Sequence, residues 1–204
     1  MFSLLSDLFF PKDYFDTYLP KQDFAARIRK VDTPNPIFQK ILVSVNYSQI
    51  EKLLERSKFS GETAIIPDFA KIMSSNLELQ INKKIIPRPD LLTFVPPDSK
   101  RLASRGYHLP EQLAQKISLQ TKILNIQILE KIQPTKAQTH LPRAERLINL
   151  EKSFALKKFP LANFNTICLI DDVATTGSTL DKCAKTILQT NPFLNIFALV
   201  LASN

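Results

Sequence analysis

One apolar run, Thr166–Ile170, limits the fold more strongly than any other segment of the chain. Its residues, Thr-Ile-Cys-Leu-Ile, offer no polar face, and a strand that is apolar on both sides has to be covered on both sides. Two acids, Asp171 and Asp172, follow at once, and beyond a short turn Leu180–Gln189 shows apolar positions at helical spacing. This order predicts an α/β fold in which a parallel sheet carries helices on both faces.

Strand-like and helix-like segments alternate along the rest of the chain. Apolar or β-branched runs predict further strands at Lys40–Val45, Leu91–Val95, Ile123–Ile132 and Leu194–Leu201. Helical spacing predicts helices at Tyr47–Ser57, Pro67–Leu77 and Leu109–Leu119. Residues 1–36 show no sustained period, which predicts an irregular or partly helical appendage and leaves residues 37–204 as the main domain.

The composition is that of an ordinary globular domain with reduced thiols. A chain of 204 residues can bury a sizeable core without the help of a disulfide or a metal. Its two cysteines, Cys168 and Cys183, lie in apolar segments, so we expect reduced core residues and a cytoplasmic location. No apolar stretch approaches the ~20 residues of a membrane span, and Met1–Phe10 lacks the basic start of a secretory signal.

The charge balance favours an anionic ligand without identifying it. The chain carries 27 basic and 19 acidic residues, a formal net charge of +8. This excess fits a phosphate-rich ligand or nucleic acid, and it equally fits a solvated basic surface. The glycines Gly61, Gly106 and Gly177 are too few for a dinucleotide fingerprint or a P-loop. A phosphate site in this chain therefore has to be of another type.

The segment after the Thr166–Ile170 strand carries the candidate chemistry. Ligands of parallel sheets bind at the carboxyl ends of the strands, where Asp171 and Asp172 are expected. Free backbone N–H groups at the start of the following helix favour an anion, and Gly177 lets the backbone approach it closely. We therefore expect the acids to accept hydrogen bonds from sugar hydroxyls. The phosphate-binding residues are then Thr175, Thr176, Gly177, Ser178 and Thr179.

A purely structural interpretation stays open for the same residues. Ser178 or Thr179 could simply cap the helix, and the two acids could simply end the strand. Each feature alone favours that interpretation, because helix caps are common. The combination of paired acids, hydroxyls and a glycine after an apolar strand favours a site for a phosphorylated sugar.

Two polar, basic segments are further candidates. Lys100, Arg101 and Arg105 are expected in a loop after the Leu91–Val95 strand, where guanidinium groups suit a pyrophosphate. Arg143 and Arg146 fall in the long loop Pro134–Arg146, and such loops often act as lids. Both segments also fit a plain solvated surface. The histidines His108 and His140 lie in these loops, and we expect no catalytic role for either.

Several blocks resemble a known family. Ile167–Thr179 resembles the binding motif of type I phosphoribosyltransferases, with four apolar residues, two acids and a Thr-Thr-Gly-x-Thr loop. Arg105-Gly106, with the preceding Val95-Pro-Pro, resembles a block of the competence protein F family. Gln138–Asn149 followed by Phe154 resembles that family's Gln…Arg…Asn…Phe block, and Tyr47 with Lys58-Phe-Ser-Gly61 resembles an upstream one. The resemblance covers roughly residues 40–201.

The resemblance implies a type I phosphoribosyltransferase fold, with a mainly parallel twisted sheet, helices on both faces and a small N-terminal hood. It implies that Asp171 and Asp172 hold the ribose hydroxyls of 5-phosphoribosyl pyrophosphate and that Thr175–Thr179 holds its 5-phosphate. Gly106 joins the expected ligand-binding residues through its block. Mg²⁺ is expected only with the pyrophosphate of the donor. Relatives often begin with a four-cysteine zinc module, but no cysteine precedes Cys168, so we expect no structural zinc.

Three classes of function remain. An enzyme would transfer the phosphoribosyl group to a nitrogen nucleophile such as a nucleobase, with Asp171 and Asp172 as the catalytic acids. A non-catalytic competence factor would keep the pocket as a sensor or scaffold and contact single-stranded DNA or a helicase of the DNA-uptake machinery. A sequence-specific DNA-binding regulator is the weakest, because the sequence shows no helix-turn-helix or zinc finger. The sequence leaves the oligomeric state open, a homo-oligomer included.

Overall fold

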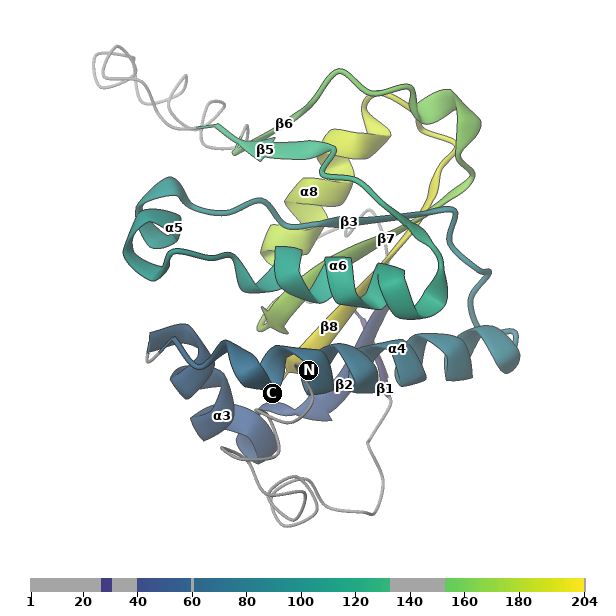
Figure 1. Ribbon diagram of the computed structural model, residues 1–204. Coiled ribbons are helices and arrows are strands. Elements are labelled where there is room, and N and C mark those ends of the chain that lie inside the picture. Colours follow the sequence, from purple (N-terminus) through teal and green to yellow (C-terminus); the bar gives the residue numbers. More distant parts are fainter. Residues whose placement is uncertain (1–26, 31–39, 60, 133–152, 204) are drawn as a thin grey trace, which may run out of the picture.

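The fold is built on a six-stranded sheet. The computed structural model describes residues 27–30, 40–59, 61–132 and 153–203. Within these, the strands lie in the order β1–β2–β8–β7–β3–β4 (Figure 1), and only β1 runs antiparallel to its neighbour. Their bounds are β1 Arg27–Arg29, β2 Ile41–Asn46, β3 Leu91–Phe94, β4 Leu124–Asn125, β7 Thr166–Ala174 and β8 Asn195–Ser203.

Helices cover both faces of this sheet. The helices α3 (Tyr47–Phe59), α4 (Ile66–Asn82) and α6 (Leu109–Thr121) pack on one face, and α8 (Ser178–Leu188) packs on the other (Figure 1). Along β7 the buried side chains alternate: Cys168 and Ile170 belong to the first core, and Ile167 and Leu169 belong to the second. The predicted α/β fold with a mainly parallel sheet of the phosphoribosyltransferase type is therefore confirmed.

The predicted strand Ile123–Ile132 is wrong as a single element. The structure divides it into β4, which pairs with β3, and β5 (Leu129–Lys131), which forms a separate antiparallel pair with β6 (Phe154–Leu156). The intervening Ile126 donates its backbone N–H to the Leu92 carbonyl. Ile128 and Leu129 are fully buried against the α8 side of the core. One β-branched run thus serves two sheets, which its composition could not reveal.

Part of the expected N-terminal appendage belongs to the main sheet. Residues 27–29 form β1, which pairs with β2 in the register Arg27↔Val43 to Arg29↔Ile41. Arg29 donates to the Ala174 carbonyl (3.2 Å) and to the Ser203 hydroxyl (2.5 Å), at the carboxyl ends of β7 and β8. Three residues are too few to show a period, so this strand could not be predicted from the sequence. The rest of the expected hood lies outside the described residues.

The remaining helical elements are short, and α4 is longer than predicted. The short elements are α5 (Ser99–Arg105) and the 3₁₀ turns Thr63–Ile65 and Leu161–Asn163. Helix α4 continues five residues beyond the predicted end at Leu77, to Asn82, and its Asn76 and Gln80 side chains are buried and hydrogen-bonded to each other. Among the described residues, no helix combines the length and apolar character that crossing a membrane requires.

Candidate functional site

Asp171 and Asp172 were predicted to follow the end of the strand. They lie inside β7, because the strand continues to Ala174. Asp171 pairs in register with Val200 of β8. An oxygen of Asp171, Oδ1, accepts the backbone N–H of Asp172 at 2.9 Å, and Oδ1 of Asp172 accepts that of Val173 at 2.7 Å. Both residues are partly buried. The local hydrogen bonds therefore hold two neighbouring carboxylates in place at the carboxyl edge of the sheet.

Lys58, in the last turn of α3, neutralises one of the two acids. Its Nζ lies 2.6 Å from Oδ2 of Asp172, and only 18% of the lysine side chain and 16% of the aspartate side chain are exposed. In an ion pair so well shielded from water the attraction is screened little, but both charged groups have lost hydration, so loss of either partner would leave a costly buried charge. The pair joins the first helix after β2 to the central strand β7.

Asp171 ionises less readily than an ordinary aspartate. Burial raises its pKa well above the ordinary value, and the neighbouring Asp172 carboxylate raises it further; the backbone N–H of Asp172 and the charge of Lys58 act in the opposite direction. Two carboxylates at this separation repel each other, so a ligand that supplies hydrogen-bond donors or positive charge is favoured there.

The turn after β7 leads directly into α8. Gly177 has a φ of 82°, in the left-handed region that favours glycine, and it is the residue before the first helical turn. The N-cap residue is Gly177, which has no side chain, and Ser178 and Thr179 lie inside the helix, so the interpretation of Ser178 or Thr179 as a simple cap is wrong. Ser178 donates its backbone N–H to the Thr176 hydroxyl at 3.3 Å. Thr175, Thr176, Ser178 and Thr179 are all exposed, which leaves hydroxyls and N–H groups of the turn accessible to an anion.

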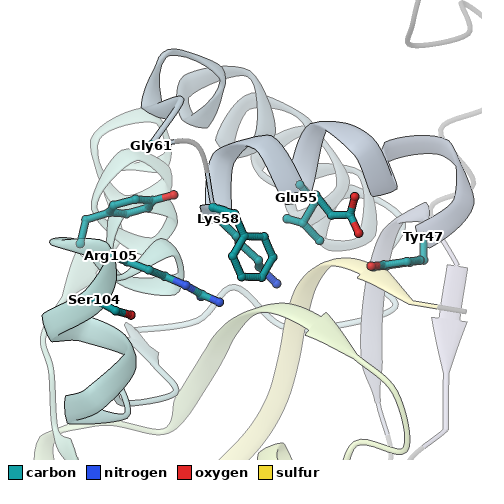
Figure 2. A pocket seen from close by; sticks show the side chains of 9 residues that line it. Tyr47, Glu55, Lys58, Gly61, Ser104 and Arg105 are labelled. Atoms are coloured by element: carbon teal, nitrogen blue, oxygen red, sulfur yellow. The ribbon is translucent and has the colours of Figure 1, made fainter.

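A cavity of about 860 Å³ lies between the end of α3 and the connection from α5 to α6. Figure 2 shows the side chains of Lys58 and Arg105 reaching from these two elements toward the same space. The Arg105 guanidinium carbon lies 5.1 Å from the centre of the Phe59 ring, within the range of a cation–π contact. The cavity is lined by Tyr47, Leu54, Glu55, Lys58, Phe59, Gly61, Ser104, Arg105 and Tyr107.

The basic segment after β3 was predicted to be a loop. The structure shows instead the short helix α5, which contains Lys100, Arg101 and Arg105. Seven residues with only two apolar side chains, the adjacent Leu102 and Ala103, gave no amphipathic pattern to detect. Gly106 ends the helix with a φ of 73°, and its N–H bonds to the Leu102 carbonyl at 2.9 Å. Arg105 lines the cavity, and the side chains of Lys100 and Arg101 lie outside the described part of the chain. Arg143, Arg146 and His140 lie outside the described residues.

Sequence reasoning assigned no role to two residues that build this cavity. The Lys58 ammonium reaches Asp172 across the sheet edge, and the Tyr107 hydroxyl donates to the Ser57 carbonyl and so ties α3 to the α5–α6 connection. The Lys-Phe-Ser-Gly61 spacing was the only available signal for Lys58. Nothing in the sequence around Tyr107 indicated its partner.

His108 lies beside the same region, before the first turn of α6, with its ring centre 5.8 Å from that of Phe94. Its Nδ1 is buried and has no hydrogen-bond partner in the described part of the chain. Burial lowers the pKa of His108 to about 4; Asp172 opposes this change and Arg105 adds to it. The imidazole is therefore neutral at physiological pH.

We expect His108 to make the fold less stable in mild acid. Between its ordinary pKa of 6.5 and about 4, the unfolded chain takes up a proton that the folded chain does not, so stability falls as pH falls through this window. Urea unfolding of the protein and of His108→Asn, from about pH 7 to about pH 5, measures the effect as the difference between the two. The raised pKa of Asp171 acts with the opposite sign and is common to both proteins. If the free energy of unfolding depended on pH equally in the two proteins, His108 would not be the cause of the loss of stability in mild acid.

No group of three or more histidine, cysteine or acidic side chains within residues 27–30, 40–59, 61–132 and 153–203 could hold a metal ion. The candidate site consists of two acids on β7, the glycine turn that follows this strand, and the cavity lined by Lys58 and Arg105, in which Lys58 pairs with Asp172.

The fold and this site define a phosphoribosyltransferase-like α/β protein, and comparison with known proteins narrows the resemblance. The chain is 28% identical over 156 residues to competence protein F of Haemophilus influenzae, a match that covers 74% of this chain and 67% of the relative. It is 26% identical over 162 residues to DNA utilization protein YhgH of Salmonella typhi, covering 79% and 70%. No family model matches the chain. The resemblance to competence protein F and its relatives, predicted from the sequence blocks, is confirmed.

Proposed function

We propose that the chain binds 5-phosphoribosyl pyrophosphate together with Mg²⁺. The observation that carries the proposal is the order of groups along β7 and α8: two partly buried carboxylates are followed, within a few residues, by an exposed turn with Gly177 at its helix N-terminus. The turn would take the 5-phosphate, because its N–H groups and the helix dipole favour an anion. Asp171 and Asp172 would accept hydrogen bonds from the two ribose hydroxyls.

The cavity supports the other end of such a ligand. A pyrophosphate attached to C1 would extend from the acids toward Lys58 and Arg105, which are the described cations directed into this space (Figure 2). Lys100 and Arg101 belong to the same helix as Arg105, and Arg143 and Arg146 remain candidates from the sequence. In this proposal a magnesium ion would arrive with the pyrophosphate, whose charge it would neutralise.

We further propose that the site can support transfer of the phosphoribosyl group. A nitrogen nucleophile, such as that of a nucleobase, would attack C1; the bond from C1 to the pyrophosphate oxygen would break, and the nitrogen would lose a proton to solvent. Asp171 and Asp172 would stabilise the positive charge that develops on the sugar. Arg105 would stabilise the negative charge of the departing pyrophosphate.

The names of the relatives favour a second function. One is called competence protein F and the other DNA utilization protein, and the net charge of +8 suits a polyanion. In this alternative the chain takes part in DNA uptake or use in the cytoplasm, the pocket acts as a sensor, and single-stranded DNA or a DNA-uptake protein is the partner. Two buried free cysteines fit such a reducing compartment. Release of pyrophosphate in the presence of nucleobases would distinguish an enzyme from a sensor.

Binding of the donor should raise the melting temperature, because a ligand that binds only the folded state stabilises it by mass action. With Mg²⁺ and donor at about 100 times the Kd, the gain is about 2.7 kcal/mol, which corresponds to roughly 5–10 °C for a chain of this size. Differential scanning fluorimetry measures the shift, with inorganic phosphate at the same concentration as the control. An unchanged melting temperature at millimolar donor would refute the proposed function.

A further inference from the structure

We infer that Lys58 is an exchanging counter-ion that makes the site prefer ligands with an anionic group at C1. In the structure its ammonium pairs with Asp172, and on binding it would pass from the aspartate to the pyrophosphate. This inference rests on the proposed function and adds a specificity-determining residue to it. Its basis is the competition between a lysine and a ligand hydroxyl for one carboxylate oxygen.

The oxygen in question is Oδ2 of Asp172. The other oxygen, Oδ1, already accepts the backbone N–H of Val173 at 2.7 Å. Lys58 Nζ approaches Oδ2 to 2.6 Å, and both side chains are more than four-fifths buried. A sugar hydroxyl that binds Asp172 at Oδ2 therefore meets the ammonium there. Binding of a ribose hydroxyl at this oxygen requires the lysine to move or to share it.

The surroundings of Lys58 allow the side chain to move while the backbone stays. The preceding residue, Ser57, is fully buried, and its carbonyl accepts the Tyr107 hydroxyl. This contact holds the end of α3 against the α5–α6 connection. The lysine side chain itself is a flexible four-carbon stem and lines the cavity that also contains Ser104 and Arg105. A short rotation carries the ammonium from Asp172 into this space.

The charges of the cavity determine which ligand compensates for the lost ion pair. Beside Lys58, the residues that line it include one further cation, Arg105, and one acid, Glu55. An ammonium released from Asp172 would add to the positive charge of Arg105, which is unfavourable unless an anion enters. A pyrophosphate at C1 supplies that anion. Ribose 5-phosphate has the same diol and 5-phosphate but no anion at C1, so it would break the ion pair without compensation.

The test compares these two ligands in the protein and in Lys58→Met, which has a side chain of similar length and no charge. Isothermal titration calorimetry should show donor affinity, with Mg²⁺, lowered by about tenfold or more, the usual effect of losing one charge-assisted hydrogen bond. Affinity for ribose 5-phosphate should rise, because nothing competes for Oδ2 of Asp172. Lys40→Met is the matched control. This exposed lysine donates a hydrogen bond to the carbonyl of Ile85, which precedes the amino end of β3. Its replacement should leave the affinities for both ligands unchanged.

The response of the two ligands separates the inference from the function on which it rests. A parallel fall of both affinities in Lys58→Met would overturn the inference, since the lysine would then only position Asp172, and so would unchanged affinities. A wild-type protein that binds neither ligand would refute the proposed function and the inference together. Lys58→Gln provides the same comparison in case the methionine variant does not fold.

Discussion

Replacement of Asp171 and Asp172 together by asparagine should lower the affinity for 5-phosphoribosyl pyrophosphate by about a hundredfold or more. Hydrogen bonds to charged groups contribute about 1.5–3 kcal/mol each, and loss of two such bonds corresponds to two or more powers of ten in Kd. Isothermal titration calorimetry with Mg²⁺ measures the change. Undiminished affinity would mean that the acids are only part of a strand.

The double variant should keep its fold, which makes the binding result interpretable. An asparagine side chain can still accept the backbone N–H groups of Asp172 and Val173 at its Oδ1. It removes the repulsion that raises the pKa of Asp171, but it also leaves the Lys58 ammonium without its Asp172 partner, so we expect a lower thermal stability with the fold retained. Glu78→Gln is the matched control, because it removes the charge of an acid on α4 together with its ion pair to Arg88. This variant should bind the donor with unchanged affinity.

Of the substitutions proposed for this protein, Phe69→Ala should lower the free energy of unfolding most. Phe69 lies on α4, is fully buried, and is among the largest side chains of the core between the helices α3, α4 and α6 and the sheet. Truncation of a buried phenylalanine removes apolar contacts and leaves a cavity, at a cost of about 3–5 kcal/mol. Urea unfolding should show a lower midpoint with an unchanged slope.

The control for this substitution is Phe193→Ala. Phe193 lies in the turn between α8 and β8, and 92% of its surface is exposed. The same chemical change there should alter stability by no more than about 0.5 kcal/mol. Equal losses in the two variants would contradict the assignment of Phe69 to the core.

The local parts of the site could be predicted from the sequence because each depends on neighbouring residues. The run Thr166–Ile170 is apolar on both faces, so its burial between two layers of helices followed from composition and period. Gly177 and the hydroxyls around it indicated a tight turn before a helix, and the structure shows that turn with a positive φ. Acids one and two residues after the apolar run were expected just beyond the strand; they lie in its last four residues, because β7 continues to Ala174.

Segments without a clear period were predicted poorly. The short helix α5 and the strand β1 are too brief to show one, and the β-branched run Ile123–Ile132 is divided between two sheets. In each case the contacts of the finished fold override a weak local preference.

The sequence by itself determined the α/β class, the central strand β7 and the acid–glycine segment, because period, turn residues and their order act over a few positions. Only the tertiary structure decided what faces that segment. The parallel order β2–β8–β7–β3 brings the end of α3 and the α5–α6 connection to the same edge of the sheet, and so sets Lys58 against Asp172 and Arg105 beside the same cavity. Such contacts depend on crossovers between distant strands, and no local pattern records which residues will meet there.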